Sequence, residues 1–380
     1  MNKLPYSRFR QTAVDLAAGT LWRMPGSFEI ARLFGASYSL RCVVFHNISA
    51  TQSPFTTGMN VSTTPGDLEG ALRFLTAHYT PVRLEDVLAD ADGHSLPARP
   101  VLVTFDDAYA SVVEVAAPLC KKFGVPAIYF VNAAFINNQR LAADNLLCYV
   151  ANTRGMKTIN AAARALRRAE VPQVNTLSEV FGSLLPSLTL AEREEFLEAV
   201  RSLSGISERR IAEESALYLT TEQLCALASF DFEIGNHTYS HAHCRAMLPK
   251  EFGQEIDRNK AELETLSGTK VRSFSQPYGS SKDLTSELAD HLERSGHRAV
   301  FLSESVANPR GADLFHLDRV NPRVDGDDSF FLDLEVLPRL RAVRNKFLRG
   351  GESVRADRNV PHVALTTAKA KNYVESVHRR

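Results

Sequence analysis

Residues 101–131 read VLVTFDDAYASVVEVAAPLCKKFGVPAIYFV and contain two apolar runs with an amphipathic stretch between them. The runs 101–105 and 125–131 have the length and composition of buried strands. Between them, apolar residues recur at helical spacing from Tyr109 to Cys120, and Gly124 is a typical residue at a helix end. A strand, a helix and a second strand in this order indicate a parallel sheet with helices packed outside it.

The same alternation continues on both sides of this stretch. Further strands are predicted at 41–46, 230–236, 271–276 and 298–303, with helices between them. Residues from about 135 to 222 interrupt the alternation and are mostly helical in character, so we interpret them as a helical insertion. A closed or nearly closed barrel suits this order. An open doubly wound sheet is the alternative, but no glycine-rich phosphate loop follows any of the strands.

Composition excludes several classes of protein. Among 380 residues, 44 Lys and Arg balance 44 Asp and Glu, which argues against a nucleic-acid-binding protein. Five cysteines without a CxxC pair exclude a disulfide-dense scaffold and a thiolate zinc finger. The first residues do not resemble a signal peptide and no run is long enough to span a membrane. We therefore expect a cytoplasmic protein.

The chain divides into three parts by composition. We expect an N-terminal segment over 1–40, a barrel with its insertion over 41–338, and a tail over 339–380. The tail carries eleven basic and three acidic residues. A solvated tail accounts for this composition. The alternative is weak peripheral contact with an anionic membrane surface, which attracts clusters of basic residues.

Polar residues that can do chemistry follow two of the predicted strands. Asp106 and Asp107 come directly after 101–105, where the chain leaves the sheet and two adjacent acids can serve one site. Their structural alternative is an exposed acid followed by a helix cap. His237 and His241 are four residues apart after another strand, and His243 is close by. One carboxylate and two imidazoles suit Zn²⁺ or a similar divalent ion, although an isolated HxxxH is as often a surface feature.

A third motif, SQPYG, follows the strand 271–276. Pro277 and Gly279 flank Tyr278 and indicate a rigid turn, which can present a backbone N–H to an oxyanion. The alternative is an ordinary surface turn.

Together, TFDD, HTYSH and PYG resemble the motifs of the polysaccharide deacetylases (NodB-homology domains, carbohydrate esterase family 4). The resemblance covers about residues 41–135 and 218–335. It implies an α/β fold, a distorted (β/α) barrel, and removal of acetyl groups from N-acetylated sugars. The roles that it implies are metal ligation by Asp107, His237 and His241, general base for Asp106, oxyanion stabilisation by the Tyr278 N–H, and support of the ligand loop by Thr238. Pro277 and His243 are expected beside the substrate.

Several residues depart from the family's pattern. Ala108 replaces the usual Gly, no Arg precedes the Pro-Tyr turn to orient the base, and Trp22 is the only tryptophan. The late histidine of the family is also not evident. These departures resemble the poly-N-acetylglucosamine deacetylases, in which an early histidine replaces the late one. His46 has that place here and is the expected general acid, with His243 and His316 as the next candidates.

The expected function is metal-dependent N-deacetylation of an N-acetylhexosamine-containing glycan or glycolipid, with Zn²⁺ as the expected ion. Two alternatives remain at this point. The same barrel can hydrolyse a small non-sugar amide, and a relative that has lost turnover can act as a carbohydrate-binding protein.

Overall fold

The structure is a computed structural model that describes residues 20, 22–33, 40–90, 95–166 and 172–348. Contacts divide the chain into a unit of residues 1–345 and a second unit that begins at Lys346. The account below concerns the first unit. Most of the N-terminal segment and most of the predicted tail lie outside the described residues.

Parallel strands form the centre of the fold and run in the order β1-β5-β6-β7-β8-β9-β10, with β4 paired to the first residues of β5. A separate small sheet consists of β2 and β3. The strand bounds are β1 Arg41–Phe45, β2 Asn47–Ile48, β3 Ser62–Thr63, β4 Thr80–Pro81, β5 Pro100–Phe105, β6 Ala127–Val131, β7 Phe232–Asn236, β8 Ser273–Ser275, β9 Ala299–Leu302 and β10 Leu317–Asp318.

The two edges of the main sheet meet. Just after β10, Val320 forms a parallel bridge with Val43 of β1. The N–H of Val44 donates to the carbonyl of Val320, and the N–H of Val320 donates to the carbonyl of Cys42. This bridge closes the path of seven strands from β1 to β10 into a distorted (β/α) barrel, as predicted.

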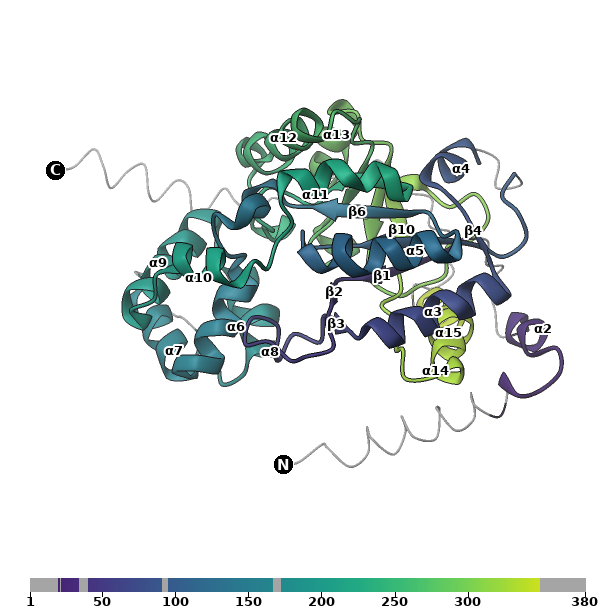
Figure 1. The fold of residues 1–380 in the computed structure, drawn as a ribbon, viewed down its shortest axis with the longest axis horizontal. Helices are drawn as coiled ribbons and strands as arrows, with labels where there is room; N and C mark the ends of the chain where they lie inside the picture. The colour runs from purple at the N-terminus through teal and green to yellow at the C-terminus, as the bar shows by residue number, and fades with distance from the viewer. Residues whose placement is uncertain (1–19, 21, 34–39, 91–94, 167–171, 349–380) are drawn as a thin grey trace. The chain divides into compact units, whose positions relative to one another are not determined.

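Helices surround the barrel and fill the connections between its strands (Figure 1). Their bounds are α2 Ser27–Arg32, α3 Pro65–His78, α4 Leu84–Ala89, α5 Ala117–Phe123, α6 Ala143–Arg154, α7 Met156–Ala165, α8 Leu177–Glu179, α9 Leu190–Ser204, α10 Glu208–Ser215, α11 Thr221–Ala226, α12 Arg258–Ser267, α13 Ser286–Arg294, α14 Asp327–Phe331 and α15 Leu337–Leu348.

Alternation along the strands separates the interior of the barrel from its outer surface. Cys42, Leu102, Phe130 and Phe301 belong to one buried cluster that joins the strands to one another and to α4. The intervening residues pack outward against helices such as α3 and α5. Strands buried on both faces explain why β1, β5 and β6 are continuous apolar runs in the sequence.

The insertion supplies helices α6 to α10, which gather on one side of the barrel in Figure 1. It leaves the barrel after β6, and its last residues return through Tyr218, which forms an antiparallel bridge with Tyr109. Both connections lie near the carboxyl ends of strands, because Tyr109 follows β5. The insertion therefore begins and ends at the mouth of the barrel.

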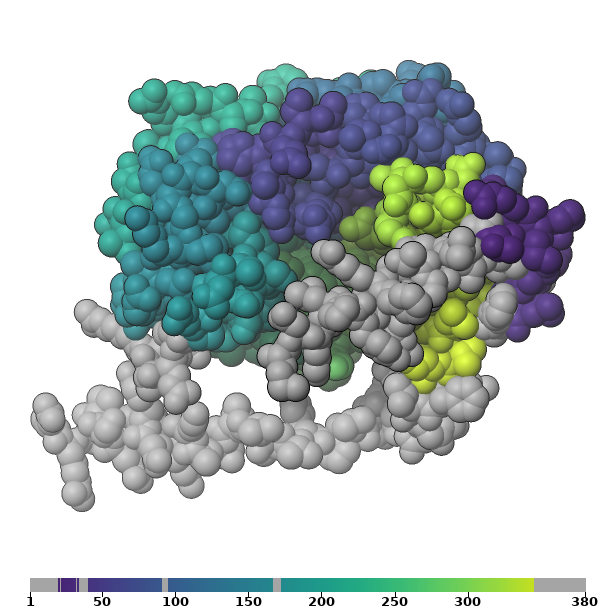
Figure 2. Space-filling view, turned by 90° about the horizontal axis from the view of Figure 1, so that it is seen from below, coloured from purple at the N-terminus to yellow at the C-terminus, as the bar shows by residue number. Residues whose placement is uncertain are grey.

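Helix α2 and the last helices cover another part of the barrel. Trp22 contacts the rings of Phe28, Phe74 and Phe331, and Figure 2 shows the purple residues of α2 beside the yellow residues that follow β10. Trp22 is thus part of an aromatic cluster between α2, α3 and α14.

The boundary drawn at Arg339 on composition lies inside helix α15. Arg339 is 1% exposed and forms an ion pair with Glu335, which also binds Arg41 of β1. The first basic residue of the predicted tail is therefore buried against the barrel. Among the described residues, no helix is both long and apolar enough to cross a membrane.

Candidate active site

The residues singled out from the motifs follow four barrel strands at their carboxyl ends. His46 follows β1, Asp106 and Asp107 follow β5, the loop from His237 to His241 follows β7, and Tyr278 follows β8. Because these strands are parallel, their carboxyl ends meet at one mouth of the barrel, where sites form in folds of this kind.

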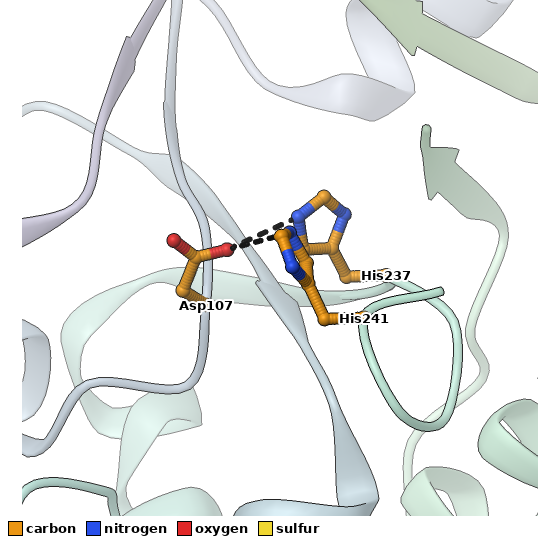
Figure 3. Close-up of side chains that lie close together, drawn as sticks. All are labelled: Asp107, His237 and His241. Atoms are coloured by element: carbon orange, nitrogen blue, oxygen red, sulfur yellow. Dashed lines mark ion pairs between the residues drawn. The ribbon is translucent and has the colours of Figure 1, made fainter. Parts of the chain in front are cut away.

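Three of these side chains converge on one point (Figure 3). The Nε2 atoms of His237 and His241 both lie 3.3 Å from Oδ1 of Asp107. One nitrogen or oxygen atom of each of the three residues lies within 4.8 Å of the others. The structure therefore brings together the three predicted metal ligands.

The hydrogen bonds of the two imidazoles leave their Nε2 atoms facing Asp107. Nδ1 of His237 lies 2.7 Å from the carbonyl oxygen of Ser275, which can only accept, so Nδ1 carries the proton. Nδ1 of His241 lies 2.7 Å from Oδ2 of Asp144 and donates to this carboxylate. With this proton on Nδ1, the neutral form of each ring has its lone pair at Nε2, and neutral histidine is the form that ligates metals.

This arrangement fits a small divalent cation. Oδ1 of Asp107 is buried and has no hydrogen-bond partner. Two ligand atoms bound tetrahedrally at about 2.1 Å from zinc lie roughly 3.4 Å apart, close to the spacing found here. The two imidazoles and one carboxylate are also ligands that zinc prefers.

Electrostatics favour the ionised form of the carboxylate. Burial acts to raise the pKa of Asp107, but the effects of His241 and His237 outweigh it. The pKa of Asp107 therefore lies well below its usual range. Burial acts to lower the pKa of His241, but Asp107 and Asp144 outweigh it and the net shift is upward. Asp107 is therefore a carboxylate at neutral pH.

Asp106 is held by an arginine that the sequence motifs do not contain. Nη1 and Nη2 of Arg319 donate to the two carboxylate oxygens of Asp106 at 2.8 Å each. Burial raises the pKa of Asp106, but Arg319 and His237 lower it by more, so the net shift is downward. The orienting Arg expected before the Pro-Tyr turn is missing, yet Arg319, just after β10, supplies a guanidinium to the same carboxylate.

Left-handed backbone conformations gather at this mouth. The φ angles are 76° at Asp107, 59° at Ala108, 61° at Thr238, 54° at His241 and 63° at Tyr278. Residues other than glycine adopt such angles at a cost of about 1–3 kcal/mol, and they do so mainly at functional sites. Gly, which is usual at the position of Ala108 in the resembling family, adopts such an angle without this cost.

Hydrogen bonds of Thr238 and Ser240 hold the loop between the two histidines. The hydroxyl of Thr238 accepts the N–H of Ala242, and its carbonyl accepts from Nδ2 of Asn132. The Ser240 N–H and hydroxyl both donate to the carboxylate of Glu255. Thr238 is thus hydrogen-bonded both within the loop and to Asn132, the residue after β6.

The Pro-Tyr-Gly turn has one fixed geometry. Gly279 has a φ of 61°, and an added Cβ would lie 2.6 Å from both N and Cβ of Ser303, so only glycine fits. Pro277 is buried before it, whereas Tyr278 remains 37% exposed. The Tyr278 hydroxyl donates to Oδ1 of Asp144 at 2.8 Å.

The candidate acids have different surroundings. His46 is partly exposed at the mouth. Burial lowers its pKa by more than the charges of Asp107 and Asp106 raise it, so the net shift is downward. The ring of His243 stacks on Tyr278 with centroids 4.6 Å apart, and its Nδ1 is buried without a hydrogen-bond partner. His316 is exposed and pairs with Asp313 at the amino end of β10, which is the opposite end of the barrel.

Sequence reasoning missed Arg319 and Asp144. Arg319 follows a strand of only two residues, and Asp144 lies in the apolar stretch LAADNLLCYV at the start of α6. The one signal for Asp144 was its charge at a position that helical periodicity buries. Both residues are far in the sequence from the site residues that they contact.

Comparisons with known proteins agree with this arrangement. A sequence model described as polysaccharide deacetylase matches residues 191–298, which include His237, His241 and Tyr278. No curated protein matches the sequence. The match supports deacetylase activity on a glycan.

Solved structures resemble the fold. The deacetylase PplD of Streptococcus pyogenes, in complex with acetate, has a TM-score of 0.52 at 15% identity, covering 78% of this chain and 97% of that chain. IcaB from Ammonifex degensii has a TM-score of 0.49 at 18% identity, and the match covers 77% of this chain and 96% of that chain. At such identities the likeness concerns the fold. Over residues 191–298 the chain is thus similar in sequence to polysaccharide deacetylases, and its barrel is similar in fold to that of PplD.

Proposed function

We propose that this protein is a metal-dependent hydrolase that removes N-acetyl groups from an N-acetylhexosamine-containing glycan or glycolipid. The proposal rests on one observation above all: Asp107, His237 and His241 converge beside the Arg319-paired carboxylate of Asp106. A protein that only binds carbohydrate has no use for a buried, oriented carboxylate next to such a set of ligands.

Asp107 through Oδ1 and the two histidines through Nε2 would hold the ion, with Zn²⁺ proposed from the ligand types. When bound, a divalent ion polarises the acetyl carbonyl and lowers the pKa of the attacking water. The hydrogen bonds from Nδ1 of His237 and His241 keep both rings oriented for this task.

Asp106 is the proposed general base. Its carboxylate takes a proton from water while the water oxygen bonds to the acetyl carbon. Arg319 fixes the plane of that carboxylate with two hydrogen bonds and keeps it ionised. The backbone N–H of Tyr278 donates to the carbonyl oxygen as negative charge develops on it.

His46 is the proposed general acid. It gives a proton to the amide nitrogen as the carbon–nitrogen bond breaks, so that acetate and a free amine leave. Burial lowers the pKa of His46 by more than the charges of Asp107 and Asp106 raise it, which makes its protonated imidazole a stronger acid. His243, stacked on Tyr278, and Pro277 are proposed to line the place of the sugar.

The experiment is acetate release from a panel of substrates by the full-length chain, with and without a chelator. The panel contains β-1,4- and β-1,6-linked oligomers of N-acetylglucosamine and a small aryl acetamide. Asp106→Asn is the matched control, because it removes the proposed base and keeps the proposed metal ligands.

We expect acetate release from at least one oligosaccharide, its loss with chelator, and its recovery with Zn²⁺ or Co²⁺. Release from the aryl acetamide alone would replace the glycan substrate with a small amide. Turnover that survives both the chelator and Asp106→Asn would contradict the proposal.

A further inference from the structure

One carboxylate from the helical insertion touches two parts of the proposed site. Asp144 is 3% exposed and lies in the first turn of α6. Its Oδ2 lies 2.7 Å from Nδ1 of His241, and its Oδ1 accepts from the Tyr278 hydroxyl at 2.8 Å. Asp144 therefore links the loop after β7 to the turn after β8.

Tyr218, near the end of the insertion, holds the start of α6 and therefore the position of Asp144. The Tyr218 hydroxyl accepts the N–H of Ala142 at 2.8 Å and donates to Oδ1 of Asn145 at 2.6 Å. Ala142 directly precedes α6, and Asn145 lies in its first turn. Tyr218 is itself bridged to Tyr109, three residues after Asp106. Tyr218 thus connects the start of α6, which carries Asp144, to the segment that follows Asp107.

A second charged residue of the insertion reaches the same loop. Arg193 of α9 is 5% exposed and donates to the carbonyl and the hydroxyl of Ser240 at 2.8 and 3.1 Å. Ser240 directly precedes His241. The insertion thus contacts both the ring of His241 and the backbone that carries it.

We infer that Asp144 is a positioning residue for metal binding and catalysis, so that the insertion is an integral part of the site. The inference rests on the proposed function. By accepting the Nδ1 proton of His241, Asp144 keeps Nε2 free for the ion and strengthens it as a ligand. By accepting the Tyr278 hydroxyl, it holds a turn whose backbone N–H is needed for the oxyanion, although Tyr278 has a left-handed φ.

Four variants of the full-length chain separate these two tasks. Asp144→Ala removes both acceptors, and Asp144→Asn keeps the shape but offers one carbonyl oxygen and no charge. Tyr278→Phe removes only the hydroxyl bond and leaves the backbone N–H. The control is Asn160→Ala, which loses the two hydrogen bonds between Asn160 and Val174 within the insertion and touches no residue of the site.

The measurement is Zn²⁺ affinity of chelator-stripped protein by competition with a chromophoric chelator, together with acetate release and thermal unfolding of the apo form. Loss of such a carboxylate typically lowers metal affinity or activity by about 10–100-fold, and we expect this for Asp144→Ala, with a smaller loss for Asp144→Asn. Tyr278→Phe should keep its Zn²⁺ affinity and lose roughly tenfold in kcat, as for one hydrogen bond. Asn160→Ala should lower only the unfolding temperature.

The outcomes distinguish this inference from the function on which it rests. If the wild-type chain binds no Zn²⁺ or Co²⁺, the proposed function fails and the inference with it. If the wild type binds Zn²⁺ and Asp144→Ala binds it equally well, the proposed function stands and the role of Asp144 is overturned. A loss of affinity in Asn160→Ala equal to that in Asp144→Ala would also overturn it, because the effect would then be one of folding.

Discussion

Arg319 and Asp106 form a buried ion pair in which two guanidinium nitrogens face two carboxylate oxygens at 2.8 Å each. Both residues are almost fully buried, at 1% and 3% exposure. The hydroxyl of Ser275 accepts a further hydrogen bond from Arg319. The pair sets the plane of the proposed general base, and it joins the end of β10 to the end of β5 across the barrel.

Replacement of this arginine tests the orientation of the base. Arg319→Lys keeps the charge but loses the two-pronged geometry. We expect kcat for acetate release to fall by about 10–100-fold, as for one charge-assisted hydrogen bond, while Zn²⁺ affinity changes little. Arg323→Lys is the matched control, because Arg323 binds Asp333 through a similar pair, and Asp333 is not a residue of the proposed site. Equal activity of both variants would remove Arg319 from the mechanism.

Complete removal of the guanidinium tests its contribution to stability. Arg319→Ala leaves the Asp106 carboxylate buried and unpaired, which costs roughly 3–5 kcal/mol of unfolding free energy for pairs of this kind. Urea unfolding of the apo protein measures this loss. A loss below about 1 kcal/mol, the usual range of exposed pairs, would contradict the buried geometry.

The general acid is tested at His46. His46→Ala should lower kcat by about 10²–10⁴-fold, because the amine then leaves without a positioned proton donor. Zn²⁺ affinity should stay near that of the wild type, since His46 is not among the proposed ligands. Single-turnover acetate release and Zn²⁺ competition check the two expectations. If the variant keeps full activity, His243 is the next residue to replace.

A buried histidine below the ligand loop predicts a dependence of stability on pH. Burial lowers the pKa of His297 to about 4, and its Nε2 accepts from Nδ2 of Asn236, the residue before His237. In the unfolded chain the pKa is about 6.5. Between these values the unfolded state binds a proton that the folded state does not, so stability falls as pH decreases from about 6.5 to about 4.

The comparison of wild type with His297→Gln isolates this effect. The advantage of the wild type in urea unfolding should be largest above pH 6.5 and shrink by up to about 3 kcal/mol near pH 4. The pKa of Asp318 is raised to about 6 by burial and acts in the opposite direction. Both proteins contain Asp318, so its contribution cancels in the difference. A difference that is constant with pH would show that His297 is not buried in its neutral form.

The barrel could be predicted from the sequence because its strands are local signals. Runs such as 101–105 and 125–131 are apolar on both faces, and they coincide with β5 and β6 to within two residues. Parallel strands then place their carboxyl ends together, which is why Asp107 and His237 could be expected side by side.

The supporting residues could not be predicted in this way. Arg319 pairs with Asp106 across 213 positions, and Asp144 meets His241 across 97. Neither contact follows from periodicity, because each depends on how the last strand closes the barrel and how the insertion folds back. The backbone conformation of Ala108 and Tyr278 could not be predicted either, because neither residue type indicates the left-handed φ found there.

The central claim is that Asp107, His237 and His241 hold one ion that the reaction requires. The most direct test is to titrate chelator-stripped wild-type protein with Zn²⁺ while acetate release from a responsive oligosaccharide is measured. The account predicts activity that rises to a plateau at one equivalent per chain, and neither bound Zn²⁺ nor activity in His237→Ala. Full activity of the stripped wild type before any metal is added would contradict it, as would one tightly bound equivalent in His237→Ala.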